Sequence, residues 1–358
     1  MVHARYSLAM ILDAISRAVL DLRLEGRHVL IAASGGVDST VLLEGMNQVA
    51  SAEGLKLSVA HINHGLRGEE SDGDERAVSL RAAGLGLRFS SARVDPRSLR
   101  EGGTKQARPT LQEAARTCRY QALESIAEDH GADCIATAHT LDDQAETVLM
   151  RLLRGASPSA LGGIPERSRD GAVVRPLLRV SRTEIEAFAR AEGLDWREDT
   201  SNASDAYTRN RLRRHWIPGL AADFNPQLLR SVARLAESQR RDSEWIDELV
   251  ESKARELWGI MEHEGAEGRL SGRGLELVDQ GWAELPEALA LRLVARAMRE
   301  LGAGRDISRV HLVRLWRFLA AQNLDTGAEL ELPAGLRLIK ARRGFRMGRI
   351  AVDDKGSC

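Results

Sequence analysis

The segment from Ser34 to Thr40 carries the residue types that bind a phosphate. It reads Ser-Gly-Gly-Val-Asp-Ser-Thr and follows the apolar run His28–Ala33, which predicts a buried strand. The apolar residues after it recur at helical spacing, so the segment joins a strand to the start of a helix. Glycines let the backbone turn tightly and approach a ligand, and the free N–H groups of a helix start attract an anion. Asp38 adds a carboxylate that can hold a metal ion or a polar reactant.

Two more apolar runs end in polar residues that could take part in chemistry. One ends at His61, and another ends at His139, which is followed by the twin aspartates Asp142 and Asp143. Single histidines are more often structural, and aspartates at a helix start are commonly caps. In a parallel sheet, however, ligands bind outside the carboxyl ends of the strands, so these loops are expected to share one crevice. ATP suits that crevice, with Mg²⁺ near Asp38 and Asp143.

Several arginines could balance the charge of phosphates. Arg116 and Arg119 lie three residues apart on one predicted helix, so both can point to one place. Residues 209–215 contain four arginines and no acid. A charge run is usually a solvated face, but this density favours an anion or a nucleic-acid backbone as partner. The basic candidates for substrate contact are Arg116, Arg151, Arg154, Arg209 and Arg211.

The elements that position these residues alternate between strand and helix. Strands are predicted at 28–33, 57–60, 87–94, 134–138 and 173–178. Capping boxes at Thr110 and Ser181 begin two of the helices, and the first has a buried stripe that includes Leu111 and Cys118. Residues 95–109 lack an apolar period and predict a mobile loop. The alternation predicts an α/β fold with a doubly wound parallel sheet.

The composition is that of a globular protein in water. Hydrophobic residues make up 43% and charged residues 29%, and the formal net charge is −1, so nucleic-acid binding requires local basic patches. The three cysteines form no Cys-x-x-Cys pair, which argues against disulfides and favours the cytoplasm. No membrane or targeting segment is expected, because the apolar residues near the N-terminus follow one face of an amphipathic helix.

Taken together, the motifs resemble those of the N-type ATP pyrophosphatases and, within them, the tRNA(Ile)-lysidine synthase family. The glycine-serine segment alone indicates only the superfamily, whereas the histidine and aspartate motifs indicate the family. The match runs from about residue 28 to residue 218. The matching motifs are Ser34-Gly-Gly-Val-Asp-Ser39, His61-x-Asn-His-x-Leu-Arg67, Glu113-x-x-Arg-x-x-Arg119-Tyr120, His139-x-x-Asp-Asp-Gln-x-Glu-Thr147, Arg151-Leu-Leu-Arg-Gly155, Arg175-Pro-Leu-Leu178, Asp199-x-Ser-Asn202 and Tyr207-x-Arg-Asn-x-x-Arg213.

The resemblance implies a ligase that joins free lysine to C2 of the wobble cytidine in the CAU anticodon of an isoleucine tRNA. ATP adenylates the C2 oxygen and releases pyrophosphate; the lysine ε-amine then displaces AMP. The implied cofactors are ATP and Mg²⁺, and the implied partners are that tRNA and free L-lysine. The number of chains that assemble stays open, with a homodimer as one option.

The resemblance also implies roles for individual residues. The catalytic set is Asp38, Arg119, His139 and Asp143, and Asp38 and Asp143 also hold the metal. The ATP-binding set is Ser34, Gly35, Gly36, Val37, Asp38, Ser39 and His61. The five basic candidates above become contacts for tRNA or substrate.

The predicted domains are a catalytic domain over 1–218, a linker helix over 219–257, a smaller, mainly helical domain over 258–349 that binds tRNA or substrate, and a tail over 350–358. In the smaller domain, helices are predicted at 286–301 and 308–322, and short strands at 329–332 and 336–339. Six basic residues and no acid lie between Arg337 and Arg349, which favours contact with the tRNA backbone over a solvated strand edge.

Other functions remain as alternatives. A tRNA-thiolating relative would generally need paired cysteines, but Cys118 and Cys134 lie among apolar neighbours. GMP and NAD synthetases share the glycine-serine segment but do not need the arginine cluster, and a non-catalytic tRNA-binding relative would not need the intact catalytic set. Two departures from the family affect tRNA recognition: Thr140 stands where many relatives have a second histidine, and a further C-terminal module of longer members is not expected here.

Overall fold

The computed structural model describes residues 2–65, 68–100, 109–197, 208–263, 270–303 and 307–350. The chain divides into two compact units, Met1–Arg240 and Arg241–Cys358. The boundary falls inside one long helix, α9 (Leu228–Leu257). The finer division at residues 218 and 257 stays a prediction.

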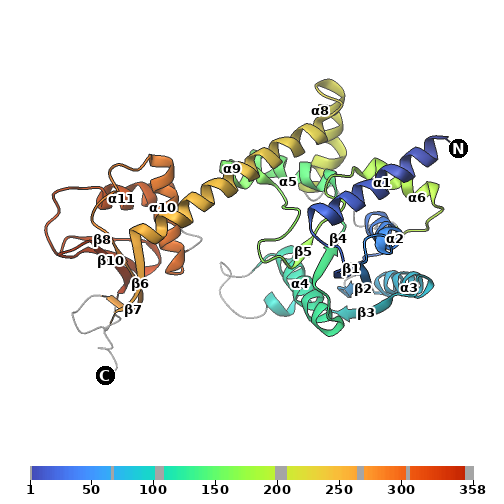
Figure 1. The fold of residues 1–358 in the computed structure, drawn as a ribbon, viewed down its shortest axis with the longest axis horizontal. Helices are drawn as coiled ribbons and strands as arrows, with labels where there is room; N and C mark the ends of the chain where they lie inside the picture. The colour runs from blue at the N-terminus through green and yellow to red at the C-terminus, as the bar shows by residue number, and fades with distance from the viewer. Residues whose placement is uncertain are drawn as a thin grey trace. The chain divides into compact units, whose positions relative to one another are not determined.

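The first unit is built on a five-stranded parallel sheet with strand order β3-β2-β1-β4-β5 (Figure 1). The strands are β1 (His28–Ala32), β2 (Lys56–Asn63), β3 (Arg88–Arg93), β4 (Cys134–Thr137) and β5 (Val173–Val174). The chain runs outward from β1 to β3 and then returns to place β4 on the other side of β1, where Val29 pairs with Cys134. The strand order therefore reverses between β1 and β4, which confirms the predicted doubly wound sheet.

Helices cover both faces of this sheet because the side chains of β1 alternate between them. Val29 and Ile31 pack into one core with α1 (Val2–Asp21), α2 (Val37–Ala50), α3 (Glu69–Gly84) and α6 (Arg182–Ala191). Leu30 lies on the other face, where α4 (Leu111–His130) packs through Leu123 and Ile126. A third cluster joins α5 (Leu141–Leu153) to the first turns of α9.

Three local predictions for this unit need correction. The strand predicted over 173–178 has only two residues, because a turn begins at Arg175 and Pro176 has no N–H for a strand partner. Leu111 is 37% exposed because it is the first residue of its helix, and the buried stripe starts at Ala114. Cys118 is half-buried and does not belong to the core. Both predicted capping boxes, at Thr110 and Ser181, are confirmed.

The predicted loop at 95–109 is described only in part. Its residues Ser98–Arg100 form a short 3₁₀ turn, and residues 101–108 lie outside the described residues. In the part of the chain that the structure describes, no helix has both the length and the apolar character needed to cross a membrane.

The second unit contains a five-stranded antiparallel sheet of order β6-β7-β10-β9-β8 together with two helices. Its elements are β6 (Trp258–His263), β7 (Leu270–Leu277), α10 (Glu287–Glu300), α11 (Arg309–Leu319), β8 (Glu329–Glu331), β9 (Leu336–Lys340) and β10 (Phe345–Ile350). Trp282, Leu293 and Phe345 lie in its core. The structure thus confirms both predicted helices and the β8–β9 pair, and it adds three strands to a domain expected to be mainly helical.

Candidate active site

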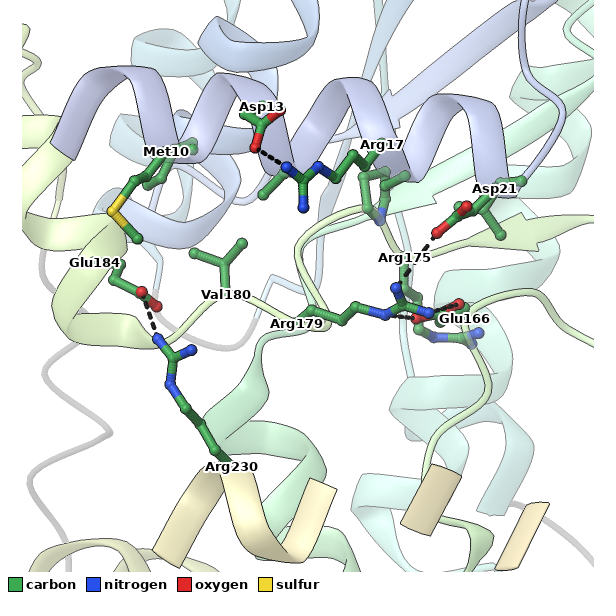
Figure 2. Close-up of a pocket in the computed structure, with 15 residues that line it drawn as sticks. Met10, Asp13, Arg17, Asp21, Glu166, Arg175, Arg179, Val180, Glu184 and Arg230 are labelled. Carbon is green, nitrogen blue, oxygen red and sulfur yellow. Dashed lines mark hydrogen bonds and ion pairs between the residues drawn. The ribbon is translucent and has the colours of Figure 1, made fainter. Parts of the chain in front are cut away.

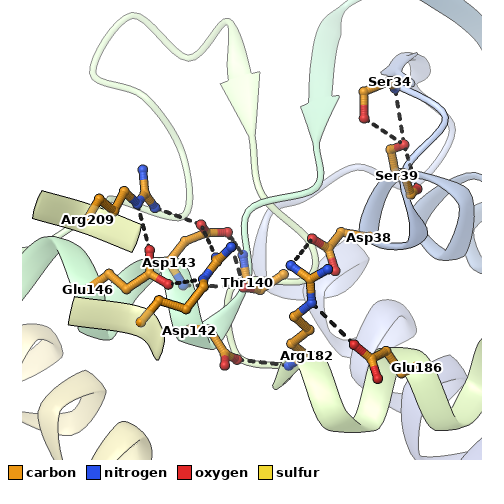
Figure 3. A network of polar contacts seen from close by, with 12 residues as sticks. Ser34, Asp38, Ser39, Thr140, Asp142, Asp143, Glu146, Arg182, Glu186 and Arg209 are labelled. Atoms are coloured by element: carbon orange, nitrogen blue, oxygen red, sulfur yellow. Dashed lines mark hydrogen bonds and ion pairs between the residues drawn. The ribbon is translucent and has the colours of Figure 1, made fainter. Parts of the chain in front are cut away.

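Two strand-to-helix corners lie at the point where the strand order reverses. The first joins β1 to α2 through residues 33–36, and the second joins β4 to α5 through residues 138–140. Because β1 and β4 are parallel neighbours, both corners emerge at the same edge of the sheet (Figure 3). Open α/β sheets bind their ligands at such a reversal. We refer to them below as the glycine-serine corner and the twin-aspartate corner.

Ser39 organises the glycine-serine corner. Its Oγ accepts hydrogen bonds from the N–H groups of Ser34 (3.1 Å) and Gly35 (3.2 Å) and donates to the carbonyl of Gly36 (3.0 Å). Gly35 has a φ of +90°, which a residue with a side chain rarely adopts. Gly36 is the N-cap of α2 and contributes no side-chain hydrogen bond. The start of α2 therefore presents backbone donors and the positive end of the helix dipole, as an anion requires.

Asp38 is the unsatisfied group of this corner. Among the described residues, its buried Oδ1 has no hydrogen-bond partner, and its Oδ2 lies 3.9 Å from Nη1 of Arg182. Burial raises the pKa of Asp38 to about 6; Arg182 works against this rise and Asp143 adds to it. A buried carboxylate oxygen without a donor has the chemistry of a ligand for a hard cation. In the described part of the chain, no cluster of three or more His, Cys, Asp or Glu side chains forms a complete metal site.

The aspartates of the twin-aspartate corner already accept hydrogen bonds from the protein. Oδ2 of Asp143 accepts hydrogen bonds from the N–H (2.9 Å) and Oγ1 (3.1 Å) of Thr140, and Thr140 caps α5 in return. Oδ1 of Asp143 accepts from Nη2 of Arg209 at 2.7 Å. Asp142 accepts from the N–H of Arg182 at 2.8 Å, which ties the start of α6 to this corner.

Glu146 anchors two arginines at the wall of the crevice. The residue is 1% exposed, and its carboxylate accepts from Nε of Arg209 (2.6 Å) and from Nε of Arg213. These arginines lie on α7 (Thr208–Arg211) and on the π-helical turn Leu212–Trp216 that continues it into α8 (Ile217–Asp223). Arg211, also predicted to contact tRNA or substrate, is exposed and donates to Oγ1 of Thr208 at 3.4 Å.

Glu146, Arg213 and Arg182 were not among the predicted site residues. Glu146 lies three residues after Asp143 on the same helix, and Arg213 lies four residues after Arg209. Helical spacing could therefore have identified both, because residues three or four apart share a face. Arg182 offered no such signal in the sequence, because its approach to Asp38 depends on how α6 packs beside α2.

The end of β2 supports the glycine-serine corner. His61 is 4% exposed, and its Nδ1 is hydrogen-bonded to the carbonyl of Ala33 at 2.9 Å, so it fixes the last residues of β1 to β2. Asn63 uses its amide to bind Asp72 (3.0 Å) and Glu75 (3.1 Å). Arg67, the last residue of this motif, lies outside the described residues, as do Asp199–Asn202 and Tyr207.

A positive cluster surrounds His139, which lies directly after β4. Its Nδ1 is hydrogen-bonded to Oγ1 of Thr137 at 2.9 Å. Burial lowers the pKa of His139 to about 4; Asp143 opposes this change, and Arg175, Arg116 and Arg119 add to it. The imidazole is therefore neutral at pH 7. Arg116 and Arg119 lie beside the ring of Tyr120, with Cζ 4.9 and 5.8 Å from its centroid.

The last two predicted basic residues lie at the end of α5. Nη1 of Arg151 donates to the carbonyls of Ala160 (2.7 Å) and Gly163 (2.9 Å), so its guanidinium fixes the chain after α5. Arg154 is the C-cap of α5 and is exposed.

A separate cavity of about 290 Å³ lies between α1, α6 and the turn after β5 (Figure 2). Its charged side chains are engaged with one another: Arg17 with Asp13 (2.8 Å), Arg179 with Glu166 (2.6 Å) and Arg230 with Glu184 (2.8 Å). These pairs neutralise the lining, so the corners remain the better candidate site.

Comparison with protein-family models and with known proteins agrees with this geometry. Residues 9–220 match a PP-loop domain, and residues 280–344 match a TilS substrate binding domain. Three curated relatives named tRNA(Ile)-lysidine synthase are similar to the chain. The relative from Geobacter sulfurreducens is 40% identical over 92% of this chain and 66% of its own length. The relative from Methylobacterium nodulans is 37% identical over 88% of both chains, and that from Solibacter usitatus is 34% identical over 91% and 68%.

The chain spans about two thirds of the length of several of these relatives. A solved structure, the U34-tRNA thiolase NcsA from Methanococcus maripaludis with its [4Fe-4S] cluster, has a TM-score of 0.55 and 18% identity, covering 66% of this chain and 80% of that one. That likeness is one of fold alone.

Proposed function

The chain belongs to the tRNA(Ile)-lysidine synthase family, and we propose that it joins free lysine to the wobble cytidine of the CAU-anticodon isoleucine tRNA in an ATP-dependent reaction. ATP adenylates the C2 oxygen of the base and releases pyrophosphate, and the lysine ε-amine then attacks C2 and displaces AMP. The observation that carries the proposal is the meeting of the two corners at the reversal of strand order. Assembly as a homodimer and a cytoplasmic location belong to the same proposal.

The glycine-serine corner binds the phosphates of ATP. The N–H groups at the start of α2 and the hydroxyls of Ser34 and Ser39 stabilise the negative charge that develops on the leaving pyrophosphate. Oδ1 of Asp38 would be the first ligand for Mg²⁺, and Asp143, whose oxygens already accept hydrogen bonds from Thr140 and Arg209, would be the second and weaker one. Mg²⁺ held there would supply positive charge that neutralises the phosphate oxygens.

The cluster around His139 holds the reacting base and the adenylate. Arg116 and Arg119 supply positive charge for the phosphate that stays on the base. That phosphate would offset the field of the arginines and so raise the pKa of His139 above about 4, while burial, the larger cause of the low pKa, would remain. In this proposal His139 accepts a hydrogen bond while the arginines are unliganded, and it becomes a stronger base once the adenylate has formed.

The tRNA is held by exposed arginines in both units. In the first unit these are Arg154 and Arg211, with Arg209 at the crevice; Arg151 has the weakest claim because its guanidinium already binds backbone carbonyls. In the second unit the basic stretch divides into two groups. Arg337 forms an ion pair with Glu329 on β8 and Lys340 forms one with Asp279 just after β7, whereas Arg342, Arg343 and Arg346 are exposed. The exposed group is the better candidate for phosphate contact.

The state of Cys134 argues against its use in a thiolating reaction. Cys134 is buried in β4, and burial raises the pKa of its thiol to about 11. A thiol with that pKa is not a thiolate at pH 7, so it lacks the reactive form that sulfur transfer needs.

Incubation of the protein with ATP, labelled lysine and an unmodified transcript of the isoleucine tRNA tests the proposal. Label should enter the tRNA, and the same transcript with uridine in place of the wobble cytidine should stay unlabelled. Unlabelled tRNA that is nevertheless bound tightly would favour a non-catalytic relative, and a reaction that depends on a sulfur donor would favour thiolation. ATP–pyrophosphate exchange with that tRNA should be lost in Asp38→Ala and Arg119→Ala; rates near wild type would reject their roles.

A further inference from the structure

A short segment after α6 holds the glycine-serine corner in place. This segment, Asp195–Arg197, is called the strap below. The N–H of Arg197 donates to the carbonyl of Gly35 at 3.0 Å, and Nε of Arg197 lies 2.5 Å from Oδ1 of Asp74 on α3. The strap therefore connects the glycine that turns the corner to the helix beside it. None of its residues was assigned a role in the reaction above.

The surroundings of Arg197 are shaped to receive its guanidinium. Asp74 is 9% exposed, so its carboxylate is a buried acid facing a cation. Gly73, its neighbour in α3, leaves space for the guanidinium, because a Cβ there would lie 3.1 Å from Nη1 of Arg197. The strap has a second attachment, in which Nη2 of Arg81 donates to the carbonyl of Asp195 at 2.7 Å. Nη1 of the same arginine pairs with Glu44 on α2 at 2.7 Å.

Apolar packing supports the corner on this side through Val78, which is 4% exposed and lies beside Gly35, but it does not fill the space there. A cavity of about 430 Å³ lies between the corner and the strap, and its lining includes Gly35, Thr40, Val78, Trp196 and Arg197. Where side chains do not fill the space beside a loop, polar contacts have to determine its position. The hydrogen bond of Arg197 to Gly35 and the ion pair to Asp74 are such contacts.

The contact with Gly35 controls a donor of the phosphate site. The carbonyl of Gly35 and the N–H of Gly36 belong to one planar trans peptide unit, so they point in opposite directions. Holding the carbonyl towards the strap aims the N–H of Gly36 away from it. Glycines on both sides of this peptide make its rotation easy, so an external constraint is needed.

We infer that Arg197 is a positioning residue for ATP, which fixes the Gly35–Gly36 peptide so that the N–H of Gly36 stays available to a phosphate. The inference rests on the proposed use of this corner to bind ATP. The backbone N–H of Arg197 holds the peptide, and its side chain keeps that backbone in place through the ion pair with Asp74. Arg197→Ala removes this ion pair. Its loss removes binding that is present both before and during the reaction, so it raises the KM for ATP while kcat stays nearly constant.

The test uses the full-length protein with Arg197→Ala and the conservative Arg197→Lys. Two measurements are made: the dissociation constant for a non-hydrolysable ATP analogue by calorimetry, and KM and kcat for lysidine formation. Arg197→Ala should raise both the Kd of the analogue and the KM for ATP about tenfold, with kcat within about twofold. Arg197→Lys, which keeps a cation opposite Asp74, should recover most of the loss. Arg17→Ala, which removes a cation from an exposed pair on α1, is the matched control and should leave both constants unchanged.

A second variant, Asp74→Asn, keeps Arg197 and removes the charge that its guanidinium faces, so it should weaken analogue binding even if Arg197→Ala fails to fold. Binding of the analogue at wild-type affinity by Asp74→Asn and by any folded Arg197→Ala overturns the inference, as does a fall in kcat at constant KM. A wild-type protein that binds the analogue but forms no lysidine would reject the proposed reaction, while weaker binding by the variants would still support the strap. A wild-type protein that does not bind the analogue would overturn both.

Discussion

The two corners at the reversal of strand order are built alike but are stabilised differently. Each follows a buried parallel strand, and each places an aspartate in the first turn of a helix. At the glycine-serine corner, Asp38 keeps a buried oxygen without a donor among the described residues, and its pKa is raised. At the twin-aspartate corner, both oxygens of Asp143 accept hydrogen bonds, from Thr140 and from Arg209.

The glycine-serine corner is therefore built to bind a ligand, and the twin-aspartate corner is built to stay rigid. The glycine-serine corner has unused donors and an unused acceptor, which destabilise the unliganded fold and are satisfied when a ligand arrives. The twin-aspartate corner has its polar groups satisfied by the protein, so it forms a fixed wall opposite the ligand. Removing charge should therefore have opposite effects on stability at the two corners.

The largest expected effect is on activity, from Asp38→Asn at the glycine-serine corner. Loss of the carboxylate should lower ATP–pyrophosphate exchange by about 100-fold or more, because the variant would lack the ligand that holds Mg²⁺ against the charge on the leaving pyrophosphate. Stability should change in the opposite sense. With a folded-state pKa of about 6 against 3.8, ionised Asp38 destabilises the fold above pH 6. The variant should thus gain roughly 1–3 kcal/mol at pH 8 and nothing below pH ~4.

Unfolding in urea at several pH values, followed by circular dichroism, measures this difference. A variant that is less stable than wild type at pH 8 would contradict the description of Asp38 as an unsatisfied group.

The second-largest expected effect is a loss of stability, from Glu146→Gln at the twin-aspartate corner. The guanidinium groups of Arg209 and Arg213 would face a neutral amide in place of a buried carboxylate. Removing one partner from a buried ion pair is strongly destabilising, and partial exposure of the arginines moderates the loss to about 2–3 kcal/mol. Urea unfolding measures it, with Asp13→Asn in an exposed pair as a control that changes stability by less than about 0.5 kcal/mol. Equal stability of Glu146→Gln and wild type would remove the contrast between the corners.

The smallest effect should come from Thr140→Ala, which removes the cap of α5. Loss of an N-cap oxygen costs about 1 kcal/mol, and Thr140→Ser should restore most of it because the hydroxyl is retained. Thermal unfolding of the three proteins side by side provides the comparison. If serine is no better than alanine, the capping box does not hold Asp143 in place.

The sequence predicted where the corners lie but not which arginines enter them. Alternating strands and helices were enough to place the glycine-serine and twin-aspartate segments at one edge of a sheet. Arg209 and Arg211 were expected to hold tRNA or a reactant, whereas the structure places Arg209 and Arg213 on Glu146. Helical spacing could have added Arg213 to Arg209 and Glu146 to Asp143, but the pairing of α7 with α5 is a contact across 63 residues of chain that no local pattern predicts.

The second unit shows a different limit. The strands β6 and β7 were not predicted, because Gly259, Gly272 and charged residues obscure the alternation that marks a strand. Their stability comes from long-range pairing, such as that of β10 with β7. A short stretch of sequence carries no information about such distant partners. The strand predicted over 173–178 was too long for the opposite reason. An apolar run continued beyond the strand into a turn at Pro176.

The strand order also has a consequence for synthesis of the chain on the ribosome. β1 pairs with β4, which is translated about 100 residues later, so one side of this central strand stays uncovered while α2 to α4 emerge. An uncovered apolar strand is a template for wrong pairing with another nascent chain. We expect the interval before Cys134–Thr137 leaves the exit tunnel to be the period in which a chaperone matters most to this protein.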